Sequence, residues 1–191
     1  PRTNDWALIA NPLYVFGTLL AYLFFVLKWG PRYMKNRKPY SLKTFLFCYN
    51  VFQIVSNAYI AYTFFNSGWS TEYTLGCEPA RYTSRPIDVR MANISKWAFL
   101  VKMIDLSETV VFVLRKKQNQ ISFLHVYHHV STVVVSYFFL KYATTGMVTM
   151  QILLNGNVHV IMYSYYLLAS LGPTAQRIAN FMKPWITRIQ I

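Results

Sequence analysis

Residues Thr44 to Phe65 read TFLFCYNVFQIVSNAYIAYTFF and contain no charged side chain. A helix that crosses a bilayer needs about 20 predominantly apolar residues, so this stretch predicts a transmembrane helix. Four more stretches are long and apolar enough for the same prediction, at residues 11–27, 93–114, 121–140 and 147–171. Another apolar stretch begins at Trp185. We therefore expect an all-α polytopic membrane protein with five transmembrane helices and the start of a sixth.

The composition agrees with a membrane protein. Of the 191 residues, 54% are hydrophobic and only 13% are charged, against about 25% charged in a soluble domain. Aromatic residues make up 18% of the chain, which excludes a disordered protein, and two cysteines are too few for a disulfide scaffold. The net charge of +13 does not predict a nucleic-acid partner, because the basic residues lie between apolar runs and not on a polar surface.

The chain starts at Pro1 and has no secretory signal pattern. We interpret residues 1–191 as a single, incomplete transmembrane domain of a larger polytopic protein. Basic residues mark the cytoplasmic side of such proteins. Eleven Lys and Arg follow the first, third and fifth apolar stretches, whereas five lie on the opposite side. This asymmetry predicts cytoplasmic basic loops and an N-terminus outside the cytosol.

Polar residues follow one face of the third predicted helix. Lys102, Asp105, Glu108 and Thr109 are spaced so that they fall within one third of the helix circumference. An ionisable group at bilayer depth costs several kcal/mol and normally faces a protein interior or a wet cavity. Two interpretations stay open: an internal ion pair that locks helices together, or the polar wall of a site.

All four histidines of the chain lie on the fourth and fifth predicted helices. His125, His128 and His129 share one face of the fourth, so three imidazoles converge. The fifth helix carries His159 within a polar stripe, whose other members are Gln151, Asn155, Tyr163 and Tyr166. Amide and phenol groups commonly join membrane helices, but a histidine among them makes the stripe a candidate second half of one site.

Two kinds of chemistry suit such a site. Neutral imidazoles bind zinc or iron, and a His-x-x-His-His string occurs in membrane di-iron desaturases and hydroxylases, which need about twice as many histidines. Alternatively, an imidazole is a general base or an acyl-accepting nucleophile without a metal. A transporter or receptor that uses intramembrane charge is a third, non-enzymatic reading.

The sequence closely resembles the animal branch of the very-long-chain fatty acid elongases, the 3-ketoacyl-CoA synthases of the endoplasmic reticulum. The resemblance covers nearly the whole chain. It rests on seven segments in a fixed order, namely residues 11–13, 30–40, 49–50, 112–117, 123–129, 157–166 and 187–190. One departure lies on the third helix, where the family has Lys-x-x-Glu-x-x-Asp-Thr and this chain has Lys102-x-x-Asp105-x-x-Glu108-Thr109.

The resemblance implies a seven-helix elongase fold with a six-helix inverted barrel around an acyl tunnel. It implies that long-chain acyl-CoA condenses with malonyl-CoA to give a 3-ketoacyl-CoA, CO2 and CoA, the first step of fatty acid elongation. No metal and no other cofactor is expected. The expected location is the endoplasmic reticulum membrane, with the N-terminus in the lumen. Self-association and contact with the ketoreductase, dehydratase and enoyl reductase of the cycle are also implied.

The resemblance also implies roles for individual residues. His128 is the expected acyl-accepting nucleophile, with His159 close to the acyl intermediate. His125 and His129 are expected to set tautomer and basicity or to assist decarboxylation. The residues expected to line the cavity are Lys102, Asp105, Glu108, Asn155 and Tyr163, and those expected to contact CoA are Arg115, Lys116 and Lys117. A metal-dependent lipid desaturase or hydroxylase is the alternative.

Overall fold

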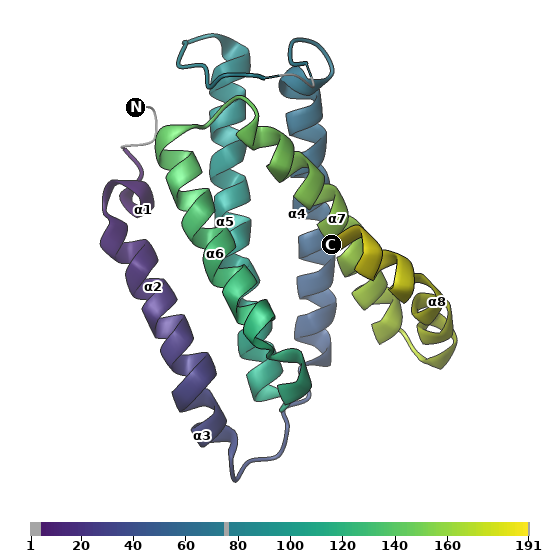
Figure 1. The fold of residues 1–191 in the computed structure, drawn as a ribbon. Coiled ribbons are helices and arrows are strands. Elements are labelled where there is room, and N and C mark those ends of the chain that lie inside the picture. The colour runs from purple at the N-terminus through teal and green to yellow at the C-terminus, as the bar shows by residue number, and fades with distance from the viewer. Residues whose placement is uncertain (1–4, 75–76, 191) are drawn as a thin grey trace. The chain divides into compact units, whose positions relative to one another are not determined.

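The computed structural model describes residues 5–74 and 77–190, and of residues 187, 189 and 190 it describes the backbone only. Within these ranges the chain is helical and contains no strand. The chain forms two compact units. One comprises Pro1–Leu42 and Ser95–Thr144, and the other comprises Lys43–Ile94 and Thr145–Ile191. Figure 1 labels the helices of both units.

The first unit begins with α1 (Ala7–Ala10) and α2 (Pro12–Phe24), which continues through the π-helical turn η1 (Phe25–Trp29) into α3 (Gly30–Met34). Asn11 caps α2, because its side chain accepts a hydrogen bond from the Leu13 amide, and Pro12 occupies the first helical position. The unit also contains η3 (Gln118–Gln120) and α6 (Phe123–Tyr142). Most of the long helix α5 (Pro86–Leu114) completes it.

The core of this first unit is apolar and is shared by its long helices. Val15 and Leu19 of α2, Leu106 of α5, and Val133 and Tyr137 of α6 are buried in it. The Tyr137 ring also meets the Phe16 ring of α2 edge to face, with 5.9 Å between centroids. Side chains on the outer face of α2 are apolar but exposed, as Leu13 (74%) and Leu20 (69%) show. An apolar outer face of this kind suits a lipid environment.

The second unit contains α4 (Lys43–Phe64) with the turn η2 (Phe65–Trp69), α7 (Val148–Ser170) and α8 (Pro173–Gln190). In this unit α4 packs along α7, and α8 packs against α7 (Figure 1). The helices α4 and α7 approach closely at Gly156. A Cβ added there would lie 3.4 Å from the Asn57 carbonyl oxygen and 3.6 Å from the Ala61 Cβ. Small residues allow such close approach between membrane helices.

The predicted helices agree with the structure except at two ends. The stretches at 11–27, 44–65, 121–140 and 147–171 correspond to α2 with η1, α4, α6 and α7. The helix predicted at 93–114 begins earlier, because α5 has Pro86 in its first position, where proline is favoured. The prediction of a new helix at Trp185 is wrong: α8 begins at Pro173, after Gly172 with φ 135°, and Pro184 lies inside it.

Among the residues that the structure describes, two helical segments are long and apolar enough to cross a membrane by length and composition, Pro12–Met34 and Phe123–Tyr142. Five membrane spans therefore remain a prediction. The all-helical structure fits an α-helical membrane protein.

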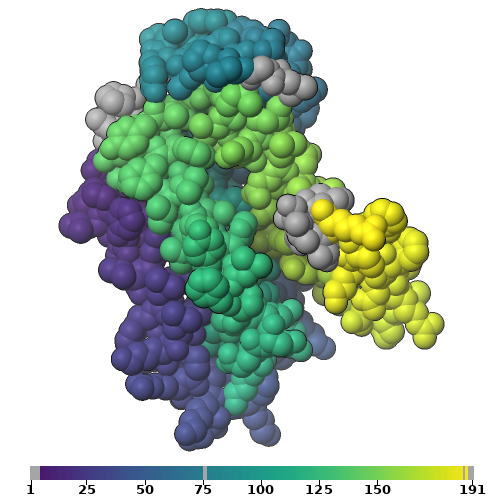
Figure 2. All heavy atoms as spheres, viewed as in Figure 1, coloured from purple at the N-terminus to yellow at the C-terminus, as the bar shows by residue number. Residues whose placement is uncertain are grey.

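The loop between η2 and α5 docks on the start of α7 within the second unit. The Thr145 hydroxyl accepts a hydrogen bond from the Arg81 amide (2.6 Å) and donates one to the Arg81 carbonyl (2.9 Å). The Met147 amide donates to the Glu78 carbonyl (3.1 Å). Between them, Gly146 has φ 82°, and a Cβ there would lie 2.8 Å from the Glu78 and Pro79 carbonyl oxygens. Figure 2 shows the loop as a compact layer of atoms against this part of the unit.

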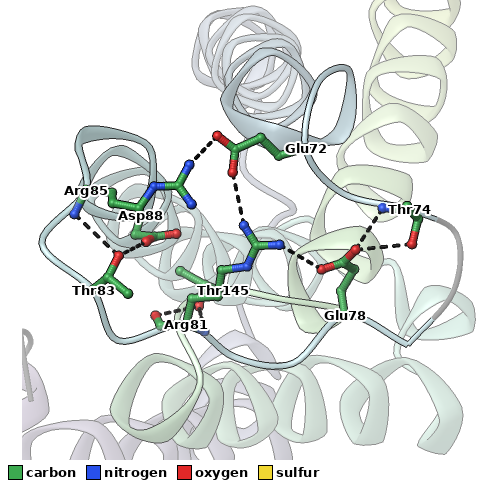
Figure 3. A network of polar contacts seen from close by, with 8 residues as sticks. All are labelled: Glu72, Thr74, Glu78, Arg81, Thr83, Arg85, Asp88 and Thr145. Carbon is green, nitrogen blue, oxygen red and sulfur yellow. Dashed lines mark hydrogen bonds and ion pairs between the residues drawn. The ribbon is translucent and has the colours of Figure 1, made fainter.

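Charged side chains hold the same loop together (Figure 3). The Arg81 guanidinium lies 3.0 Å from a Glu72 carboxylate oxygen and 3.1 Å from one of Glu78. Arg85 also pairs with Glu72, and the Thr83 hydroxyl donates to Asp88. Hydrogen bonds from the amide and hydroxyl of Thr74, together with Arg81, hold the pKa of Glu78 below its ordinary value.

Replacing Gly156 by leucine should lower the unfolding free energy by about 1–3 kcal/mol, because a Cβ there is already in contact with α4 and the further leucine atoms would push α4 and α7 apart. Gly17→Leu is the matched control, since no heavy atom lies within 4 Å of a Cβ at Gly17. Thermal unfolding in detergent measures both variants. Equal melting temperatures for the two would contradict this packing.

Acidification should loosen the loop. Because the folded pKa of Glu78 is depressed, its contribution to stability is fully present above the unfolded pKa and is lost as pH falls through the lower, folded pKa. Hydrogen exchange of the loop peptides, corrected for intrinsic rates, should therefore accelerate at acid pH. Glu78→Gln should show fast exchange already at pH 7. The idea fails if this variant keeps the exchange pattern of the unaltered protein.

Candidate active site

The polar face of α5 lies within the first unit and is largely buried. Lys102 Nζ donates to Asp105 Oδ2 at 3.1 Å, an ion pair one turn apart on the same helix. Asp105 is 2% exposed, Glu108 8% and Thr109 fully buried. This ion pair lies within α5 and joins no second helix, whereas Glu108 and Thr109 contact α6, so both interpretations of the polar face stay open.

The first turns of α6 present three imidazoles. The Ser122 side chain caps this helix by accepting a hydrogen bond from the His125 amide at 3.1 Å, so the helix begins just before the histidines. The ring centroids of His125 and His129 are 4.4 Å apart, and those of His128 and His129 are 5.8 Å apart. His129 is buried, whereas His128 is exposed. The predicted convergence of the three imidazoles is confirmed.

Contacts between α5 and α6 join the two polar faces. Thr109 Oγ1 lies 2.9 Å from His125 Nε2, and it accepts a hydrogen bond, also of 2.9 Å, from the Tyr22 hydroxyl of α2. A carboxylate oxygen of Glu108 lies 3.7 Å from His129 Nε2. The ligating atoms of Glu108, His125 and His129 all lie within 4.8 Å of one another. Imidazoles and carboxylates are the groups that most often act as general acids and bases, and this donor set also suits a metal ion.

His159 lies in the second unit, on α7. It is buried, and its ring centroid is 5.6 Å from that of Tyr163, which is fully buried. The Tyr163 ring meets the Tyr49 ring of α4 edge to face at 5.8 Å. Asn155 is half-buried one turn before His159. The structure thus brings His159 and Tyr163 together, and the idea that they share one site with the α6 histidines stays a prediction.

Sequence reasoning missed a polar stripe on α4. Asn50, Gln53 and Asn57 are buried in the second unit. The Gln53 amide nitrogen donates to the Tyr49 hydroxyl, and the Asn57 amide nitrogen donates to Gln53 Oε1, each at 3.0 Å. The spacing of three and four residues was the available signal, since it places all three amides on one helix face.

The basic residues that follow α5 form a tight turn. Lys116 has φ 55°, and the amides of Lys116 and Lys117 donate to the Val113 and Phe112 carbonyls, as in a Schellman C-cap. Lys116 Nζ reaches the Lys35 carbonyl at 3.3 Å. Arg115 and Lys116 are half-buried, and Lys117 is exposed.

Of the motif at residues 187–190, the side chains of 187, 189 and 190 lie outside the described part, and Arg188 lies over the Trp185 ring.

The apolar helices and the cluster of imidazoles and carboxylates where α5 meets α6 fit an α-helical membrane protein with a polar site. Comparison with known proteins gives the family. The model of the ELO family, described as GNS1/SUR4 family, matches residues 7–191. The chain therefore belongs to the ELO (GNS1/SUR4) family.

Its relatives include named proteins of animals. The chain is 41% identical over 193 residues to very long chain fatty acid elongase 1 of Mus musculus and 42% identical to that of Homo sapiens. It is 39% identical over 191 residues to very long chain fatty acid elongase 7 of Rattus norvegicus. Each alignment covers all of this chain and 68% of the relative.

Replacing Thr109 by valine should lower the unfolding free energy by about 1–3 kcal/mol, because it leaves Tyr22 and His125 without this partner in a buried place. Thr109→Ser keeps the hydroxyl and should stay close to the unaltered protein. Thr18→Val removes an exposed helix hydroxyl and is the second control. If the Thr109→Val and Thr109→Ser variants have the same melting temperature in detergent, the Thr109 hydroxyl does not stabilise the fold.

Proposed function

We propose that this protein condenses a long-chain acyl-CoA with malonyl-CoA to give a 3-ketoacyl-CoA, CO2 and CoA, the first step of fatty acid elongation. One observation carries the proposal: the α6 imidazoles contact the polar face of α5 in a chain of the ELO family. Its relatives are named very long chain fatty acid elongases. Those names do not favour the alternative of a metal-dependent lipid desaturase or hydroxylase.

His128 is the proposed nucleophile. A neutral imidazole nitrogen attacks the thioester carbonyl, the C–S bond breaks, and the imidazole proton leaves with CoA as the thiol. Malonyl-CoA then loses CO2, and the resulting enolate attacks the acyl carbon, which releases the imidazole; water returns its proton. Exposure of His128 beside the buried His129 supports this assignment, since a nucleophile must be reachable by substrate.

The remaining residues take supporting roles in the proposal. His125 and His129 set the basicity of the cluster or assist decarboxylation, and the Thr109 contact orients His125. His159 lies near the acyl intermediate. The proposed cavity lining is Lys102, Asp105, Glu108, Asn155 and Tyr163. Loss of CO2 supplies the driving force, so the reaction needs no redox cofactor and no metal.

The proposed location is the endoplasmic reticulum membrane, with several spans and the N-terminus in the lumen. Arg115, Lys116 and Lys117 then lie on the cytoplasmic side, where their positive charge attracts the polyanionic CoA. The positive φ of Lys116 supports a role for this turn, because a lysine in the left-handed region is strained. Self-association and contact with the ketoreductase, dehydratase and enoyl reductase belong to the same proposal.

His128→Ala should abolish condensation, because no other group would accept the acyl chain. The assay supplies a long-chain acyl-CoA and malonyl-CoA to the intact protein in detergent and detects 3-ketoacyl-CoA by mass spectrometry. Tyr127→Phe is the control, since Tyr127 is exposed and neighbours His128 in the sequence. Product formation at an unaltered rate by well-folded His128→Ala protein would exclude His128 as the nucleophile.

A further inference from the structure

A second property of the α5–α6 cluster concerns metal ions. Glu108, His125 and His129 offer one carboxylate oxygen and two imidazole nitrogens, all within 4.8 Å of one another. All three belong to the same unit, and Glu108 and His129 are 8% and 7% exposed. Within the described residues no other group of three such side chains comes together in this way.

The donor set is one that zinc prefers. Two histidines four residues apart lie on one face of α6, and a carboxylate from the neighbouring helix completes a His2Glu set, which leaves the fourth tetrahedral position open. Zinc bonds of about 2.0–2.1 Å place neighbouring ligand atoms about 3.3 Å apart. The three atoms are close enough to contract to this spacing by side-chain rotation.

The surroundings support a bound cation. The ion pair of Lys102 with Asp105 already balances the other two charges on this face of α5. Glu108 is thus the carboxylate that faces the imidazoles, with 3.7 Å between its Oε2 and His129 Nε2. Thr109 holds the His125 ring, and such outer contacts fix the orientation of histidine ligands.

We propose that Glu108, His125 and His129 form a binding site for a divalent transition cation, Zn²⁺ above all, and that its binding inhibits the protein. A nitrogen lone pair that binds the metal accepts no proton, so an occupied site withdraws two imidazoles from acid–base chemistry. The inhibition rests on the proposed condensing function. The binding site does not, because it follows from the three side chains alone.

Zinc titration tests the site. The intact protein is purified in detergent with chelator, the chelator is removed, and binding of Zn²⁺ is measured by calorimetry. Co²⁺ absorption then reports the coordination geometry. We expect one site per chain with a tetrahedral Co²⁺ spectrum. Glu108→Gln and, separately, His129→Gln should each weaken zinc binding at least tenfold. Glu72→Gln removes a carboxylate from the α4–α5 loop and should bind as the unaltered protein does.

Absence of stoichiometric zinc binding would overturn the site. So would a zinc affinity in both ligand variants that equals the affinity of the unaltered protein. Condensation measured in chelator is the reference for inhibition, and added zinc should reduce it in proportion to the occupancy that calorimetry gives. If condensation requires added zinc, both the proposed inhibition by zinc and the proposed metal-free reaction are wrong. Loss of condensation under all conditions, with binding intact in the unaltered protein and weakened in Glu108→Gln, would refute the proposed function but support the site.

Discussion

The hydroxyl of Thr109 is the contact on which the site in the first unit depends. It accepts a hydrogen bond from Tyr22 of α2 and lies within hydrogen-bond distance of His125 of α6, so one buried atom joins three helices. Helices with apolar surfaces gain little direction from hydrophobic contact when lipid surrounds them. A polar contact at a fixed depth therefore sets how α5 and α6 rotate toward each other, and with it the approach of Glu108 to His129.

Most of the helical architecture could be predicted from apolar runs. The uncharged stretch 44–65 became α4, and Asn11 and Ser122 cap the helices that follow them. The errors arose where hydropathy is a poor guide. The first turns of α5 are polar but still helical after Pro86, and α8 is an amphipathic helix that starts at Pro173 and passes Pro184 without ending. The two compact units were not predicted, because the chain passes from one unit to the other three times, one of them inside α5.

The sequence predicted which site residues share a face of one helix, but not which residues of different helices contact each other. Spacing alone placed His125, His128 and His129 on one face of α6, but the partners of each depend on helix rotation, which no sequence period fixes. Neutral amides gave a weaker signal than charges. Asn50, Gln53 and Asn57 were missed although they form a buried stripe in the same unit as His159. The left-handed backbone of Lys116 also had no sequence signal, since glycine is the usual residue there.

We propose that these imidazoles perform acyl chemistry without a metal. The most direct measurement incubates the intact, detergent-purified protein with long-chain acyl-CoA, malonyl-CoA and excess chelator, and follows 3-ketoacyl-CoA by mass spectrometry. We expect product in the presence of chelator, with CO2 released in equal amount. Well-folded protein that forms no product with any chain length in a panel of acyl-CoAs, and becomes active when iron or zinc is added, would contradict it.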